Sequence, residues 1–326
     1  MTRHICLMAA ALFFAELLVN PEAKAGGLTV SLTFDSTFTS SFGANTAQAE
    51  AAANYAAQQF QNLFVDPVKI NITVSGVSDT SIFGQSSSSL LGYYSYTQIR
   101  TALVSDAKGA NDAAAIASLP VKDPTAANGA SDFVTTRAEG KAMGLIASDS
   151  TNDGTIKFGA GYNWTFDPAN RAVSGKYDFI GVVEHEISEV MGRQGITGGN
   201  LGNGGPDFDP LDLFRYTAAG VRGASNNGAG VYFSTNGGVT NLITYNNAAS
   251  NGLDTADWAS GQGNDAFNQY SNSGVLNGIT AVDQQQMDVI GWDLASNVPE
   301  PSSLSLIAIG AIGYCAYYWR RQRATP

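Results

Sequence analysis

The polar and apolar positions near the start of the chain follow first a strand periodicity and then a helical one. Residues 28–34 alternate apolar and polar side chains, which predicts a half-buried strand. Residues 44–64 place alanine and aromatic side chains at helical spacing, and residues 69–74 alternate again. A strand, a helix and a second strand in this order predict a β-α-β unit with a right-handed crossover.

The middle of the chain mixes loop, helix and strand patterns. Residues 78–89 are rich in serine and glycine and are expected to form a loop, whereas residues 96–104 and 110–118 predict short helices. Residues 155–158 and 162–166 are expected to form two strands that pair across a glycine-rich turn. Together with the β-α-β unit, these elements predict an α+β fold.

An apolar stripe predicts a helix over residues 178–193. The stripe consists of Ile180, Val183, Ile187 and Val190. This spacing buries one side of the helix and leaves an adjoining face for polar groups. Residues 196–296 are rich in glycine and asparagine and are expected to form a loop-rich lobe. Within this lobe we expect short β segments near 213–216, 231–234 and 241–245, and a helix near 280–290.

The helix over 178–193 carries the clearest candidate chemistry. His185 and Glu189 are four residues apart and therefore share one face, and Glu186 directly follows His185. In zinc peptidases a His-Glu-x-x-His sequence supplies two imidazole ligands, and its glutamate acts as the general base on a bound water. Here a carboxylate, which can also bind zinc, replaces the second imidazole. We expect His185 and Glu189 to be metal ligands and Glu186 to be the catalytic base.

This helix resembles the active-site helix of the zincin superfamily. Gly192 stands where the metzincin branch has a glycine, but Gly195 occupies the position of that branch's third histidine. The resemblance implies a Zn²⁺ site whose third ligand comes from elsewhere in the chain. The candidates are downstream carboxylates, and Asp212 or Asp209 is expected to be the third ligand.

The two ends of the chain carry export signals. Residues 1–25 have the charged start, apolar core and small-residue cleavage pattern of a secretory signal peptide. Residues 297–326 contain a Pro-Glu-Pro box, an apolar stretch over 304–319 and three arginines, and in this order they resemble a PEP-CTERM sorting signal. The resemblance implies an exosortase-type processing enzyme, a Gram-negative bacterium, a transient inner-membrane anchor, and a final place in the cell envelope or extracellular polysaccharide matrix. A plain transmembrane tail anchor is the alternative, although this stretch is shorter than the roughly 20 residues of a comfortable span.

The order of motifs along residues 26–296 resembles a family of exported bacterial metalloproteases with PEP-CTERM tails. The motifs include residues 28–35, 70–74, 178–180, 212–216 and 288–293. The resemblance implies a zincin-like domain, in which a backing helix and an active-site helix accompany a twisted mixed sheet. The implied function is hydrolysis of peptide or protein substrates with a zinc-activated water.

Other interpretations of the same residues stay open. The glutamates around His185 fit a solvated acidic face, with the imidazole partly buried beside it. Asp207, Asp209 and Asp212 fit turn and cap chemistry first, and a Ca²⁺ site of hard oxygen ligands second. The missing histidines also fit a catalytically degenerate zincin that acts as a surface or matrix binding protein.

Composition excludes several other classes. The formal net charge is −11, and the predicted tail is basic, so the exported body is still more acidic and is not expected to bind nucleic acid. The cysteines, Cys6 and Cys315, lie in the terminal segments, which leaves the body without a disulfide or a cysteine nucleophile. The body also lacks a Gly-x-Ser-x-Gly elbow and a phosphate-binding glycine loop.

Overall fold

The computed structural model describes residues 27–126 and 132–295. Up to residue 126 the elements are β1 (Thr29–Phe34), α2 (Ser36–Phe42), α3 (Thr46–Leu63), β2 (Lys69–Val77), β3 (Gly84–Ser88), β4 (Leu90–Tyr94), α4 (Tyr96–Asp106) and α5 (Ala110–Ser118). From residue 132 to the candidate helix they are β5 (Asp132–Thr136), α6 (Arg137–Ala142), β6 (Gly154–Gly159), β7 (Trp164–Thr165), β8 (Tyr177–Asp178) and α7 (Phe179–Val190). Strands and helices are mixed along the chain, and the predicted α+β fold is confirmed.

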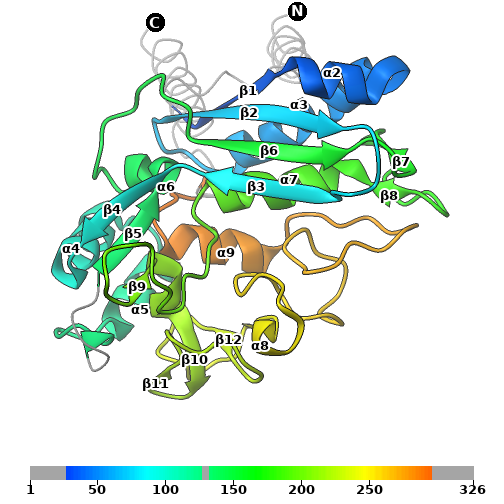
Figure 1. The fold of residues 1–326 in the computed structure, drawn as a ribbon. Helices are drawn as coiled ribbons and strands as arrows, with labels where there is room; N and C mark the ends of the chain where they lie inside the picture. The colour runs from blue at the N-terminus through cyan, green and yellow to red at the C-terminus, as the bar shows by residue number, and fades with distance from the viewer. Residues whose placement is uncertain (1–26, 127–131, 296–326) are drawn as a thin grey trace, which may run out of the picture. The chain divides into compact units, whose positions relative to one another are not determined.

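The main sheet has the strand order β1-β2-β6-β3 (Figure 1). β1 and β2 are parallel, with Leu32 opposite Ile72, and β2 and β6 are parallel, with Val74 opposite Ile156. β3 runs antiparallel to β6 and is the last strand of the sheet. In Figure 1, β3 is the strand of this sheet nearest the C-terminal segments drawn in yellow and orange.

The two long helices α3 and α7 pack against the sheet and against each other. α3 buries a row of small side chains, Ala49, Ala52, Ala53, Ala56 and Ala57, which allow the helix to approach its neighbours closely. α7 begins at Phe179, whose buried ring contacts the rings of Phe42, Phe158, Trp164 and Phe166. This aromatic cluster fixes the first turn of α7, and therefore the direction in which the polar residues of the helix point.

Two expectations for the middle of the chain are wrong. Residues 78–89 are not only a loop, because β3 pairs along its length with β6. An edge strand beside a polar helix face can be built from serines, so its sequence lacks the apolar alternation of a buried strand. Residues 155–158 and 162–166 do not pair with each other: β6 pairs with β2 and β3, and β7 pairs with β8. Pairing between distant strands outweighs the local turn signal.

The C-terminal part consists of short elements joined by loops. They are β9 (Asp207–Phe208), a 3-10 helix (Pro210–Phe214), β10 (Arg215–Ala218), β11 (Val221–Arg222), β12 (Tyr232–Phe233), β13 (Ile243–Thr244), α8 (Ala248–Asn251) and α9 (Ala281–Val289). The predicted final helix is confirmed: Asp283 accepts the backbone N–H of Thr280 at 2.8 Å, and Gly291 follows the helix with φ of 115°. The segment 213–216, expected to be β, begins in the 3-10 helix, because Asp209 caps that turn.

Within 27–126 and 132–295, no helix is both long and apolar enough to cross a membrane. The predicted signal peptide and the apolar stretch 304–319 lie outside the described residues.

A group of buried carboxyls joins the end of the C-terminal segment to the loop before β2. Asp66, which is 2% exposed, accepts the backbone N–H of Asp293 at 2.9 Å, and Asp293 also pairs with Lys108. Burial, followed by the charge of Asp293, raises the pKa of Asp66 to about 7, and the same two causes raise the pKa of Asp106 to about 7. Between pH 3.8 and about 7, Asp66 and Asp106 therefore remain protonated in the folded protein but are ionised in the unfolded chain.

We expect this group to make the protein less stable as the pH rises. The stabilising contribution is complete below the unfolded carboxyl pKa of 3.8 and is lost as the pH passes through about 7. For Asp66 the slope is at most about 1.4 kcal/mol per pH unit. Urea unfolding at pH 5 and pH 8 should show a weaker pH dependence for Asp66→Asn than for the wild type, with Glu50→Gln as the matched control. An unchanged pH dependence in Asp66→Asn would contradict this assignment.

Candidate metal centre

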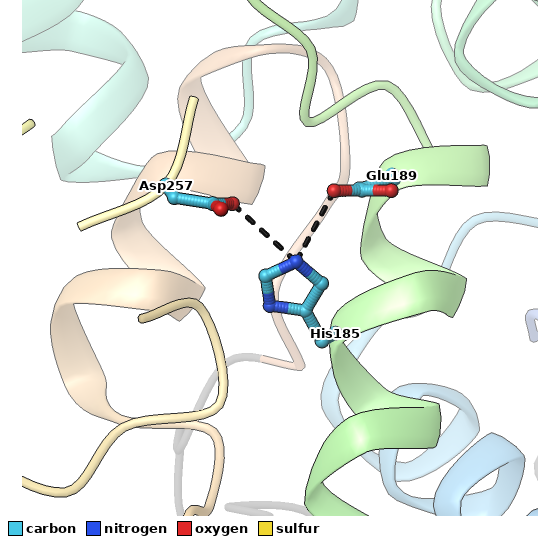
Figure 2. Close-up of side chains that lie close together, drawn as sticks. All are labelled: His185, Glu189 and Asp257. Carbon is cyan, nitrogen blue, oxygen red and sulfur yellow. Dashed lines mark hydrogen bonds and ion pairs between the residues drawn. The ribbon is translucent and has the colours of Figure 1, made fainter. Parts of the chain in front are cut away.

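The polar face of α7 brings an imidazole and two carboxylates together. His185 Nε2 lies 3.2 Å from Glu189 Oε1, on the next turn of the same helix. It also lies 3.4 Å from Asp257 Oδ1, which comes from the loop-rich C-terminal part. The ligand atoms of these three residues all lie within 4.8 Å of one another. Figure 2 shows both carboxylates directed at the same ring nitrogen.

The second ring nitrogen fixes the orientation of His185. Its Nδ1–H donates to the backbone carbonyl of Ala266 at 2.8 Å, since a carbonyl oxygen can only accept. In the neutral ring this leaves the lone pair on Nε2, the atom that faces Glu189 and Asp257. Histidine ligands of metals are usually held in this way, by a carbonyl or carboxylate on the far nitrogen.

The distances from the imidazole nitrogen to the two carboxylates are compatible with a tetrahedral zinc ion. Zinc binds imidazole nitrogen and carboxylate oxygen at about 2.0–2.2 Å, so neighbouring ligands of a tetrahedral site lie about 3.3 Å apart. The two separations from His185 Nε2, 3.2 Å and 3.4 Å, agree with that value. One nitrogen and two oxygens would supply three protein ligands and leave a fourth position open, as in catalytic zinc sites.

A buried arginine holds the two carboxylates in place. Arg193 Nη1 donates to Asp257 at 2.6 Å, and Nη2 lies 3.3 Å from Glu189 Oε1. Its Nε donates to Ser188 at 2.7 Å, and the guanidinium lies 4.7 Å from the ring centre of Phe267. Arg193 is fully buried, so its charge acts on both carboxylates with little screening.

The charges of the group set its protonation. Burial and Arg193 would lower the pKa of His185, but Asp257 and Glu189 raise it to about 10. Burial would raise the pKa of Glu189, yet the hydrogen bond and charge of His185, together with Arg193, hold it at about 2. In the metal-free site the imidazole is therefore protonated and Glu189 is ionised, whereas burial raises the pKa of Asp257. A metal must displace the proton from Nε2, so its affinity should rise with pH.

Glu186 lies next to this group, but its carboxylate is buried against β3. The residue is 4% exposed, and its carboxylate packs against Gly84 on β3, where a Cβ atom would overlap it. Burial, and then the charge of Glu189, raise the pKa of Glu186 well above its usual value. A carboxylate with a raised pKa that faces a cleft is suited to accept and return a proton.

The group lies in a cleft of about 450 Å³ between β3, α7 and the C-terminal loops. Its walls include Phe83, Gly84 and Ser86 on one side, and Leu253, Ala266 and Tyr270 on the other. Glu189 is further held by Ser86 of β3, whose hydroxyl donates to Oε2 at 2.5 Å. The edge strand and the group of His185, Glu189 and Asp257 therefore share one cavity.

The structure does not bring Asp209 or Asp212 to His185, so the expected third ligand has to be corrected. Asp209 accepts the N–H of Asp212 at 2.9 Å, and Asp212 accepts the N–H of Thr197 at 2.9 Å. Both are buried in a separate cluster, where Asp212 lies 3.8 Å from Arg215. Turn and cap contacts account for their positions, and Asp257 stands beside His185 instead.

No motif in the sequence marks Asp257 as a metal ligand. It lies 68 residues beyond Glu189, in a stretch that reads as loop, and no fixed spacing connects it to the helix. Only the fold brings it to α7, through a backbone bond from Asn246 N–H to Asp257 O of 2.8 Å and the burial of the adjacent Trp258.

A second group of carboxyls, Asp66, Asp106 and Asp293, has ligand atoms equally close together. It contains no imidazole, and Lys108 pairs with Asp293. Within the described part of the chain, His185 belongs to the group that has the mixed nitrogen and oxygen donors of a zinc site.

The comparison with known proteins finds a family match in the tail of the chain. Residues 297–322 match the PEP-CTERM protein-sorting motif, so the predicted sorting signal is confirmed. Searches of curated proteins and of solved structures find no match, and no metallopeptidase family is identified. The motif is a signal that exosortase recognises, and it indicates an exported protein with a membrane-anchoring sorting tail in a Gram-negative bacterium.

Proposed function

We propose that this protein is an exported zinc-dependent metallopeptidase of zincin-like architecture. The observation that carries the proposal is the convergence of His185 Nε2, Glu189 and Asp257, whose ligand atoms all lie within 4.8 Å of one another. The carbonyl of Ala266 holds the far nitrogen of the imidazole, as in many metal sites. Arg193 contacts the same two carboxylate oxygens, Glu189 Oε1 and Asp257 Oδ1, that face His185 Nε2. A mixed sheet with α3 and α7 packed on it agrees with the zincin topology implied by the sequence resemblance.

The residues of the site have distinct roles in this proposal. His185, Glu189 and Asp257 would hold Zn²⁺, which when bound supplies acidity to a water and polarises a carbonyl. Glu186 takes a proton from the attacking water on its carboxylate and returns it to the amine that leaves. Arg193 holds Glu189 and Asp257 in position, and its charge lowers the pKa of both carboxyls. Two carboxylate ligands and the buried arginine would leave the loaded site with a modest net charge.

The position of β3 suggests how a peptide binds. β3 ends the main sheet and borders the cleft that contains Glu186. The unpaired backbone groups of an edge strand can bind an extended peptide as an additional strand. A peptide bound in this way would run past Glu186 and the metal ligands, with alternate side chains directed into the cleft.

A metal-free binding protein is the second candidate. Arg193 already pairs with both Glu189 and Asp257, so the group is electrostatically satisfied without an ion. In that case the chain would be a degenerate zincin that binds a partner or polysaccharide in the envelope. Metal content and hydrolysis distinguish the two candidates.

The first test is metal content. We expect purified wild-type protein to contain one zinc per chain, and His185→Ala or Asp257→Asn to lower zinc affinity by at least about 100-fold, because each removes a ligand. Elemental analysis after dialysis against defined free zinc measures this. Asp212→Asn is the matched control and should retain zinc. Zinc loss in Asp212→Asn but not in Asp257→Asn would refute the ligand assignment.

The second test separates binding from catalysis. Glu186→Gln should keep the zinc but lower kcat for peptide hydrolysis by about 10²–10⁴-fold, because general acid–base catalysis contributes that much. Fluorogenic peptides and elemental analysis on the same preparation give both values. Equal hydrolysis by the wild type and Glu186→Gln would instead favour the binding protein.

The third test concerns the sorting tail. We infer that an exosortase-type enzyme cuts the chain near Pro299, after the apolar stretch and the arginines have halted translocation. Mass spectrometry of the protein from its native envelope should find a C-terminus near Pro299. An intact chain ending at Pro326 in the inner membrane would support a plain tail anchor.

A further inference from the structure

A small polar pocket opens beside the metal ligands. It has a volume of about 240 Å³ and is lined by Ser86 and Ser88 of β3, by Glu189 and Gln194, and by Asp254. Ser86, Glu189 and Asp254 also line the main cleft, so the pocket adjoins it. Ser86 and Ser88 are two residues apart on β3, and both face the pocket because side chains alternate along a strand.

The side-chain donors of this pocket are already used within the protein. Ser86 donates to Glu189 Oε2 at 2.5 Å, and Ser88 donates to the backbone carbonyl of Glu189 at 3.2 Å. The amide of Gln194 donates to Ser88 at 2.8 Å. A ligand that enters therefore meets acceptor atoms and negative charge.

Among the residues that the structure describes, Asp254 is the carboxylate of the pocket that forms no ion pair. Its Oδ1 accepts the backbone N–H of Ala256 at 2.6 Å, and the residue is exposed. The nearby Arg193 forms its ion pairs with Glu189 and Asp257 instead. Among the described residues, no lysine or arginine forms an ion pair with Asp254. The remaining oxygen of Asp254 is thus available to a donor from outside.

The pocket offers acceptor atoms whose side-chain donors are already used, and one carboxylate without an ion pair. Its volume admits a group of a few heavy atoms. These properties fit an ammonium or guanidinium group. We propose that the Asp254 pocket binds a lysine or arginine side chain of the substrate, next to the bond that is cleaved. The proposal rests on the proposed peptidase function, because a peptide along β3 would direct a side chain past Ser86 and Ser88 into the pocket. Asp254 is then a specificity residue and takes no part in proton transfer.

The test uses the purified zinc-loaded protein at pH 8 and peptides that differ at one position. Lysine, glutamine and glutamate are compared at each position around the scissile bond. At one position we expect kcat/KM for lysine to exceed that for glutamine by at least about tenfold, with glutamate cleaved least. Asp254→Asn should remove the lysine preference, so that the ratio of kcat/KM for the lysine and glutamine peptides falls to about one. Asn can still accept the N–H of Ala256, so the loop should keep its conformation.

Glu50→Gln on α3 is the matched control, because it removes the same charge on a helix that does not line the pocket. It should keep the lysine preference. The proposal is overturned if the wild type shows no preference for lysine at any position, or if Asp254→Asn retains the preference.

Binding measurements keep this proposal separate from the proposed function. If no peptide is hydrolysed, the peptidase assignment fails, and fluorescence anisotropy with the same lysine and glutamine peptides tests the pocket directly. Tighter binding of the lysine peptide that disappears in Asp254→Asn would support the pocket as a cation site. Equal binding of both peptides would overturn it.

Discussion

The site depends on the ion pairs of one buried arginine. Glu189 and Asp257 approach the same imidazole nitrogen, and in a poorly solvated site their charges would repel each other strongly. Arg193 offsets this repulsion because it contacts both carboxylates from a position four residues after Glu189 on the chain. Its Nε bond to Ser188 and its packing on Phe267 prevent the guanidinium from turning away. The loop that carries Asp257 is thereby joined to α7.

The position of the site follows from the packing of α7, β3 and the loop that Arg193 joins to the helix. α7 is held by the aromatic cluster around Phe179 at its first turn and by the sheet along its length, so His185, Glu186 and Glu189 point toward β3 and the C-terminal loops. Gly84 lets the edge strand approach Glu186 closely, and Ser86 adds a hydrogen bond to Glu189. The cleft is therefore built from a rigid helix, an edge strand and a loop joined to the helix by Arg193.

Sequence patterns predicted those parts of the site and fold that depend on residues close together along the chain. The helix, the pairing of His185 with Glu189, and the first β-α-β unit follow from periodicities within a few turns. The sequence patterns did not predict the third ligand, Asp257, or the edge strand β3. Asp257 reaches the helix only through tertiary contacts, and the serines of β3 lack the apolar alternation that indicates a strand. Asp212 was the closer candidate along the chain, but cap contacts hold it in another cluster.

The proposed function requires one zinc ion in the space between His185 Nε2, Glu189 and Asp257. Crystals of the protein grown with zinc, with diffraction data collected on both sides of the zinc absorption edge, test it most directly. A bound zinc ion should give one anomalous peak at about 2.0–2.2 Å from the imidazole nitrogen and from an oxygen of each carboxylate. No peak at this position, with the imidazole still bonded to both carboxylates, would contradict the proposed function.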